Sequence, residues 1–70
     1  MLQLTQLTDG IFVDELQDSI FHGGIEMSAV AAQFGVAEDR VRDWLVAKNL
    51  PPRVTQHAVL KWLNEQLDPS

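Results

Sequence analysis

The 70-residue sequence contains no cysteine and only two histidines. The absence of cysteine excludes a disulfide framework, and two distant histidines are too few for a structural zinc site. No apolar run approaches the roughly 18 residues of a membrane-spanning helix. No basic residue precedes the apolar positions of the first ten residues, as a secretory signal would require. The sequence therefore predicts a cytoplasmic protein with no membrane contact and no metal or other cofactor.

The arrangements of residues that carry catalysis are also lacking. The chain has no Ser/His/Asp or Cys/His set placed on turns, no glycine-rich phosphate loop and no metal-ligand spacing. The pair Gly23-Gly24 is interpreted as the end of a helix, and a chain of this length leaves little room for a substrate cleft. We expect that the protein is not an enzyme.

Basic residues are few and are confined to one part of the chain, whose net charge is −5. Residues 1–36 contain no base. The five bases all lie further along the chain: Arg40, Arg42, Lys48, Arg53 and Lys61. Nucleic-acid binding depends on Lys and Arg displacing counterions, so the overall charge opposes it. The separation of charge nevertheless leaves a basic region that could contact DNA and an acidic half that could face another partner.

Hydrophobic residues make up 46% of the sequence, which favours a globular fold over disorder. Seventy residues are enough for one domain, and we expect residues 1–70 to form it. A chain of this size buries only about 60% of its unfolded surface, so we expect added stability from idealised helix packing or from self-association.

A first helix is predicted within residues 9–22. Four apolar residues recur at helical spacing: Phe12, Val13, Leu16 and Ile20. With Thr8 as the N-cap, Leu7 and Phe12 occupy the two positions of a hydrophobic staple. Residues 1–7 alternate loosely between apolar and polar, which is typical of a short edge strand, an ordered arm or a frayed terminus.

The stretch from Met27 to Val46 predicts a helix, a tight turn and a second helix. Each helix has an apolar face, formed by Val30, Ala31 and Phe34 and then by Val41, Trp44 and Leu45. Gly35 can adopt the left-handed conformation that ends a helix. The first of these helices is expected at about 26–34, or over a shorter range if Ser28 is its cap. The second is expected at about 38–48 and ends at Asn49.

These apolar positions, with Gly35 in the turn, resemble the helix-turn-helix of bacterial and phage DNA-binding regulators. The resemblance implies that the second helix, about Glu38 to Lys48, is a recognition helix that enters the major groove. The outward positions are then Ala37, Glu38, Asp39, Arg42, Asp43 and Val46. The sequence departs from the family at Ala37, where Ser or Thr is usual, and in having three acidic residues among the six outward positions.

A last helix is predicted at about 55–67, after Pro51-Pro52, with Thr55 as its cap and Val54 and Val59 as a staple. Its expected buried face comprises Ala58, Val59, Trp62, Leu63, Gln66 and Leu67. The second half of the chain resembles the end of the small winged-helix domains of phage excisionases and terminase small subunits. The segment that carries this resemblance is DWLVAKNLPPRVTQHAVLKWLNEQL. Residues 51–54 are too few for the two strands of a wing. Arg53 is therefore the one basic residue left to make the contacts that a wing would make.

Five residues are candidate DNA contacts: Arg40, Arg42, Asp43, Lys48 and Arg53. Arg42 is assigned to a base edge and Arg40 to a flanking phosphate, while an acid such as Asp43 can accept a hydrogen bond from cytosine. In the alternative interpretation, Arg42 forms an ion pair with Asp39 on its own helix. Lys48 and Arg53 then interact with the helix dipole or are solvated charges. We expect both tryptophans to pack in the core.

The sequence thus predicts an all-α fold of three to four helices with a helix-turn-helix. The expected function is binding of duplex DNA through the second motif helix, as a homodimer that regulates transcription or recombination in a phage or mobile element. The alternative is a protein-interaction module or inhibitor. Its partner would contact the acidic residues Asp14, Glu15 and Asp18, or three apolar residues expected to be exposed: Phe21, Val46 and Leu60.

Overall fold

The computed structural model describes residues 7–67, which contain four α-helices and no strand. The helices are α1 (Asp9–Phe21), α2 (Met27–Phe34), α3 (Glu38–Leu45) and α4 (Arg53–Leu67). This arrangement confirms the predicted all-α fold. The strand or arm predicted for residues 1–7 lies, apart from Leu7, outside the described residues, as does the chain after residue 67. Within residues 7–67, no helix is long and apolar enough to cross a membrane.

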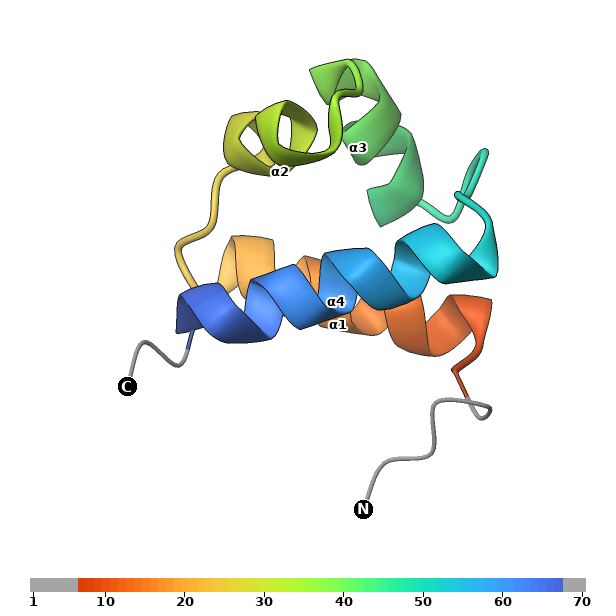
Figure 1. Cartoon of the computed structure of the whole chain (residues 1–70), viewed down its shortest axis with the longest axis horizontal. Coiled ribbons are helices and arrows are strands. Elements are labelled where there is room, and N and C mark those ends of the chain that lie inside the picture. Colours follow the sequence, from red (N-terminus) through yellow and green to blue (C-terminus); the bar gives the residue numbers. More distant parts are fainter. Residues whose placement is uncertain (1–6, 68–70) are drawn as a thin grey trace.

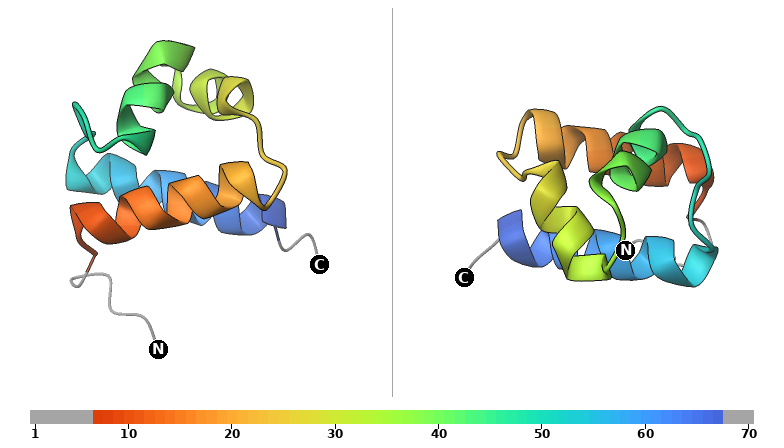
Figure 2. Two further views of the ribbon diagram at one scale, coloured as in Figure 1. Left: turned by 180° about the vertical axis from the view of Figure 1, so that it is seen from behind. Right: turned by 90° about the horizontal axis from the view of Figure 1, so that it is seen from above.

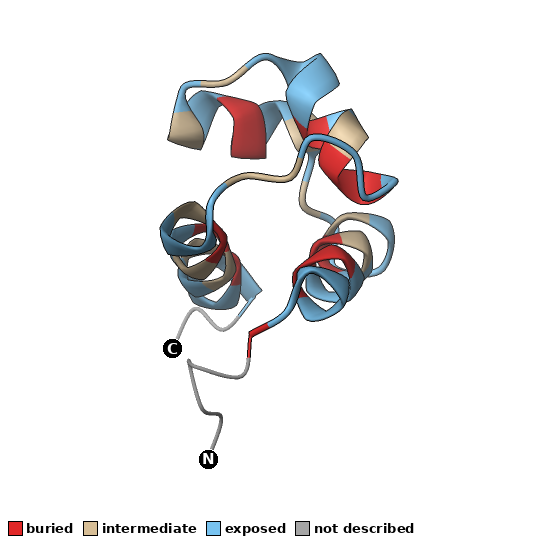
Figure 3. Cartoon of the chain, turned by 90° about the vertical axis from the view of Figure 1, so that its right-hand side faces the viewer, coloured by how far each residue is buried: buried red, intermediate tan, exposed pale blue. Residues whose placement is uncertain are grey.

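The four helices form two layers (Figure 1). Helices α1 and α4 lie side by side and run in the same direction, and α2 and α3 cover one side of this pair (Figure 2). Helix α1 contacts both α4 and α3, and α2 contacts α3. Figure 3 looks along α1 and α4 and shows their buried residues turned toward the interior of the molecule.

The core joins residues from all four helices. Phe12 and Leu16 of α1 are completely buried, as are Val30, Val41 and Val59 from the three other helices. The rings of Phe12 and Trp44 pack edge to face with their centroids 6.0 Å apart, which ties α1 to α3. The apolar stripes predicted for the first helix and for the helix-turn-helix supply most of this core, and the removal of their surface from water is the main force that stabilises it.

Helix α1 begins as the sequence predicts. The Thr8 Oγ1 atom accepts a hydrogen bond from the Ile11 amide at 3.2 Å, which satisfies one of the free amides at the start of the helix. Leu7 and Phe12, the two staple residues, are both buried in the core. The helix ends before Gly23, where an added Cβ atom would lie 2.7 Å from the Ser19 carbonyl oxygen and from a methyl carbon of Leu67. Only glycine allows this close approach.

A three-residue turn, residues 35–37, joins α2 to α3 and completes the predicted helix-turn-helix. Gly35 ends α2 in the left-handed conformation with φ +66°, and the Val36 amide donates to the Ala31 carbonyl at 3.0 Å. Ala31 is buried and Val36 is half-buried against the core. The N-cap of α2 is Glu26, which makes no side-chain capping bond, so the alternative of Ser28 as the cap was wrong.

Helix α3 ends at Leu45, three residues before the predicted end at Lys48. The left-handed residue that follows the cap is Ala47, with φ +62°, whereas Asn49, the predicted stop, lies two residues further on with φ +49°. The Lys48 amide donates to the Asp43 carbonyl at 2.8 Å, and the Ala47 amide donates to the Trp44 carbonyl at 3.0 Å. These two bonds form a Schellman motif. The chain turns early because it must lead back to α4 while Leu45 remains buried.

Replacing Ala47 with glycine is expected to raise the free energy of unfolding by about 0.5–1 kcal/mol. An alanine in the left-handed region costs about 1–2 kcal/mol, and the greater freedom of glycine in the unfolded chain offsets part of this gain. Chemical denaturation measures the difference. The matched control is Gly35→Ala, where the added Cβ meets no atom within 4 Å and only the conformational cost remains. A destabilised Ala47→Gly protein would contradict the left-handed cap.

Helix α4 begins at Arg53, two residues before the predicted cap, Thr55. The Pro52 carbonyl accepts hydrogen bonds from the amides of Thr55 and Gln56 at 2.9 and 3.0 Å. Proline suits a helix start because its missing N–H would have no partner there and its φ is already helical. Val54 is 74% exposed, so the predicted staple between Val54 and Val59 does not form.

The buried face of α4 differs from the prediction. Its three buried residues are Gln56, Val59 and Leu63. Leu60, which was expected to be exposed, is half-buried and packs against the core, whereas Leu67 is 43% exposed. The predicted exposure of Phe21 and Val46 is confirmed. Packing against α1 sets this rotation of α4, and the spacing of apolar residues within the helix does not determine it.

Candidate nucleic-acid interface and adjoining groove

The outward surface of α3 carries more negative than positive charge. Of the six outward positions predicted from the sequence, five are exposed and Asp43 is half-buried. Glu38, Asp39 and Asp43 contribute −3 and Arg42 contributes +1, so the surface has a net charge of −2. The first two acids lie in the first turn of α3, where the helix dipole favours negative charge. Favourable contact with DNA must therefore come from bases on and beside this surface.

Arg42 forms an ion pair on its own helix. Its guanidinium Nη1 lies 3.7 Å from the Asp39 Oδ1 atom, and both side chains are mostly exposed. This is the i,i+3 pair that the sequence offered as an alternative to DNA contact. An exposed pair of this kind contributes little to stability, so a phosphate or a base edge could replace Asp39 at small cost.

Asp43 has a structural partner in the turn after α3. Its Oδ2 atom accepts a hydrogen bond from the Asn49 side-chain amide at 3.3 Å, and its carbonyl holds the Lys48 amide. The carboxylate thus helps to fix the loop between α3 and α4. Lys48 is exposed in this loop and forms no ion pair with a carboxylate of residues 7–67.

Arg53, another predicted DNA contact, belongs to a hydrogen-bonded network at the start of α4. Its Nη1 atom lies 3.3 Å from Asp9 Oδ1 and donates to Gln56 Oε1 at 2.8 Å. Gln56, 2% exposed, also donates from Nε2 to Asp9 Oδ1 and to the Pro51 carbonyl, each at 3.0 Å. The network fastens the start of α4 to the start of α1. Sequence reasoning missed Gln56, whose spacing from Val59 and Leu63 was the available signal.

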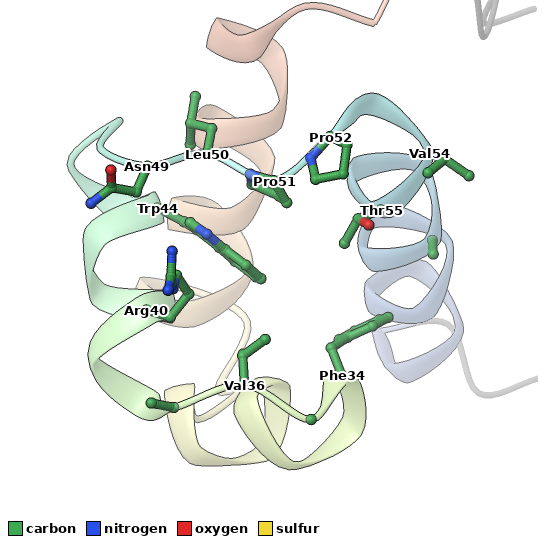
Figure 4. Close-up of a pocket in the computed structure, with 13 residues that line it drawn as sticks. Phe34, Val36, Arg40, Trp44, Asn49, Leu50, Pro51, Pro52, Val54 and Thr55 are labelled. Atoms are coloured by element: carbon green, nitrogen blue, oxygen red, sulfur yellow. The ribbon is translucent and has the colours of Figure 1, made fainter.

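Arg40 faces a different side of α3 from Arg42, because two residues are separated by about 200° around a helix. It lies at the edge of a groove of about 730 Å³ between α3, the loop after it and the start of α4. Figure 4 shows Arg40 and Trp44 turned toward the same space as Val36 and Pro51. Arg42, predicted to contact a base edge, and Arg40, predicted to contact a flanking phosphate, thus lie on two different surfaces of α3.

The groove combines an apolar lining with hydrogen-bond donors. Among the residues that the structure describes, Arg40 is the one charged residue in the lining, and Trp44 forms part of the wall. The indole Nε1 of Trp44 is buried and has no hydrogen-bond acceptor among residues 7–67. Sequence reasoning placed Trp44 correctly in the core but missed the groove, which depends on how the Pro51-Pro52 loop passes across α3.

The acidic surface predicted on the first helix is present on α1. Asp14, Glu15 and Asp18 are exposed, and Phe21 beside them is 66% exposed. Gln17, from the same helix, turns inward and donates from Nε2 to the Leu45 carbonyl at 2.7 Å, which holds the end of α3 against α1. Helix α1 therefore presents one charged side to solvent while its other side supports α3.

Comparison of the chain with protein-family models, curated protein sequences and solved structures finds no match.

Proposed function

We propose that this protein binds duplex DNA through its helix-turn-helix, with α3 presented to the major groove. The observation that supports this most directly is the three-residue turn at Gly35, which leaves the outward side of α3 exposed at the surface. Each of the chain's bases lies in α3 or after it, between residues 40 and 61, whereas residues 1–36 contain none. This is the electrostatic asymmetry that DNA binding requires in an acidic chain.

In this proposal, Arg42 contacts a base edge, while Arg40, Lys48 and Arg53 contact phosphates on either side of α3. The carboxylates on the outward surface oppose the phosphates, so a single copy of the chain binds weakly. A homodimer would bring two copies of α3 to adjacent half-sites and would offset this weakness. The protein would then act in the cytoplasm as a regulator of transcription or recombination, and the sequence resemblance suggests a phage or mobile element.

Selection from random duplex DNA at low salt tests this proposal, with the Arg40→Ala/Arg42→Ala variant run in parallel. We expect the wild-type protein to enrich a sequence and the variant to enrich none. Loss of two phosphate or base contacts also lowers the slope of log affinity against log salt by up to about 2, since each phosphate contact contributes roughly 0.9. Circular dichroism of the variant establishes that it is folded.

The spacing of repeated elements in the enriched sequence reports the dimer, because two recognition helices related by two-fold symmetry read half-sites about one helical turn apart. If the folded wild-type protein enriches no sequence, the DNA-binding proposal fails. The second candidate function, recognition of a partner protein, is favoured by the net charge of −2 on the outward surface of α3 and by the exposed carboxylates Asp14, Glu15 and Asp18 on α1. A partner with a basic surface would fit the negative charge of α3 and α1.

A further inference from the structure

The groove beside α3 has an apolar lining that belongs mainly to the turn after α2 and to the loop before α4. Val36 supplies one wall, and Leu50 and Pro51 supply another across the groove. Both Val36 and Leu50 are half-buried and pack partly against the core, so their positions are held by the fold. The volume of about 730 Å³ lies within the range of small-molecule sites, which are commonly about 300–1,000 Å³.

Hydrogen-bond donors meet at one side of this groove. The buried Trp44 Nε1–H has no acceptor among the described residues, and in Figure 4 the nitrogen-bearing edge of its ring lies on the side of Arg40. The Arg40 guanidinium carries only donors and forms no ion pair with a described carboxylate. The buried indole N–H favours a ligand that brings an acceptor, because an unsatisfied buried donor is costly. The exposed Arg40 guanidinium beside it would add a charged partner for the same acceptor.

The charge of the lining selects the kind of acceptor. No carboxylate of residues 7–67 lines the groove, although the chain carries twice as many acidic residues as basic ones. A carboxylate accepts hydrogen bonds through two oxygens and forms a charge-assisted pair with a guanidinium, whereas a neutral carbonyl gains only the weaker bond. The apolar lining formed by Val36, Leu50 and Pro51 would hold a hydrocarbon or aromatic body attached to that carboxylate.

We propose that this groove is a binding site for an apolar carboxylate. Its carboxylate accepts hydrogen bonds from Arg40 and from the Trp44 indole N–H, and its apolar body rests against Val36, Leu50 and Pro51. The indole N–H is buried in the structure, so the proposal requires the exposed Arg40 side chain to move and uncover it for the ligand. A free organic acid and the carboxyl-terminal residue of a polypeptide share this chemistry. The inference does not rest on DNA binding, although the ligand would withdraw Arg40 from any phosphate.

Titration of the full chain with hydrocinnamate, followed by ¹H–¹⁵N NMR, tests the site without nucleic acid. The Trp62→Phe variant identifies the indole N–H resonance of Trp44, and the amide spectrum shows that each variant is folded. We expect this resonance to move and to saturate with hydrocinnamate. The neutral analogue hydrocinnamamide should bind about tenfold more weakly, because it lacks the charge-assisted bond that is worth at least this factor.

Arg40→Gln should weaken hydrocinnamate binding by about tenfold, as expected for loss of one charged partner. Arg42→Gln is the matched control, since it removes the same charge from a different side of the same helix and should leave binding unchanged. Acetyl-alanyl-phenylalanine with a free or an amidated carboxyl end provides the second arm. Tighter binding of the free peptide than of hydrocinnamate points to a polypeptide end, and the reverse order to a free acid.

Several outcomes would overturn the proposal. A Trp44 resonance that does not move with either carboxylate, or that moves without saturating, excludes the site. Equal affinities for hydrocinnamate and its amide would show that the carboxylate does not contribute to binding. Equal losses for Arg40→Gln and Arg42→Gln would show a general effect of charge in place of a contact in the groove.

Discussion

Replacing Trp44 with alanine is expected to remove most of the protein's stability. Trp44 is only 2% exposed, packs against the Phe12 ring of α1 and contributes to the groove wall. Removal of a buried tryptophan costs about 3–5 kcal/mol, because it loses both the burial of the ring and the packing around it. A chain of this length has a free energy of unfolding of about 4–10 kcal/mol. Thermal unfolding followed by far-ultraviolet circular dichroism should show a largely unfolded variant or a much lower Tm.

Two further variants separate the burial of the ring from its chemistry. Trp62 is only half-buried and packs edge to face on Phe34 with centroids 6.0 Å apart, so Trp62→Ala should be less damaging. Trp44→Phe keeps an aromatic ring beside Phe12 and removes the buried N–H that has no described acceptor, which relieves a cost of about 1–3 kcal/mol. This variant should retain most of the stability. A Tm for Trp44→Ala near that of the wild type would contradict the central position of Trp44 in the core.

Replacing Gln56 with glutamate is expected to lower the free energy of unfolding by about 2–4 kcal/mol at neutral pH. The side-chain amide of Gln56 donates to both Asp9 Oδ1 and the Pro51 carbonyl. A glutamate carboxylate at this buried position would place an oxygen that only accepts hydrogen bonds against the Asp9 carboxylate and the Pro51 carbonyl. An uncompensated buried charge of this kind costs several kcal/mol. Arg53 offsets part of this cost, because it can retain its bond to the remaining oxygen. Urea denaturation at neutral pH measures the loss.

The pH dependence of this effect has a definite sign. Burial and the neighbouring Asp9 carboxylate would raise the pKa of the new glutamate above its unfolded value of about 4.3. Below that value the side chain is protonated in both states and can donate a hydrogen bond, so the penalty is absent. As the pH rises through the raised pKa, the variant loses stability relative to the wild type. The gap between the two proteins should therefore shrink on acidification, and a constant gap would contradict the network.

The partner residue provides a control for this experiment. Asp9→Asn removes the negative charge that faces residue 56, so combining it with Gln56→Glu should recover part of the lost stability. The two residues are 47 positions apart in sequence but are joined by a direct hydrogen bond, so their effects should not be additive. Gln56→Met, which is neutral and similar in size, isolates the loss of the hydrogen bonds alone.

The two proposals for the surface around α3 make different demands on Arg40 and Arg42. DNA binding uses both arginines, whereas the groove uses Arg40 alone because Arg42 lies on another side of α3. Arg42→Gln should therefore weaken only DNA binding, and Arg40→Gln should weaken both activities. If both proposals hold, an apolar carboxylate in the groove would compete with DNA for Arg40.

The sequence by itself determined the all-α class, the approximate positions of the helices and most of the core. Apolar residues at helical spacing identified the buried sides of α1, α2 and α3, and Thr8 and Gly35 marked a helix start and a helix end. These features follow from local physics, because capping bonds and helical periodicity involve residues within about four positions of one another. The local ion pair of Arg42 with Asp39 was foreseen as an alternative for the same reason.

Only the tertiary structure decided the early end of α3, the start and rotation of α4, the burial of Gln56 and the groove beside Arg40. Each of these depends on a contact between distant parts of the chain, such as that of Gln56 with Asp9 or of Gln17 with Leu45. Ala47 adopts a left-handed conformation that its own preference disfavours, because the chain must return to α4 with Leu45 buried. Packing of the two helix layers outweighs local preference at these positions, since burying apolar surface stabilises the fold by more than one strained residue costs.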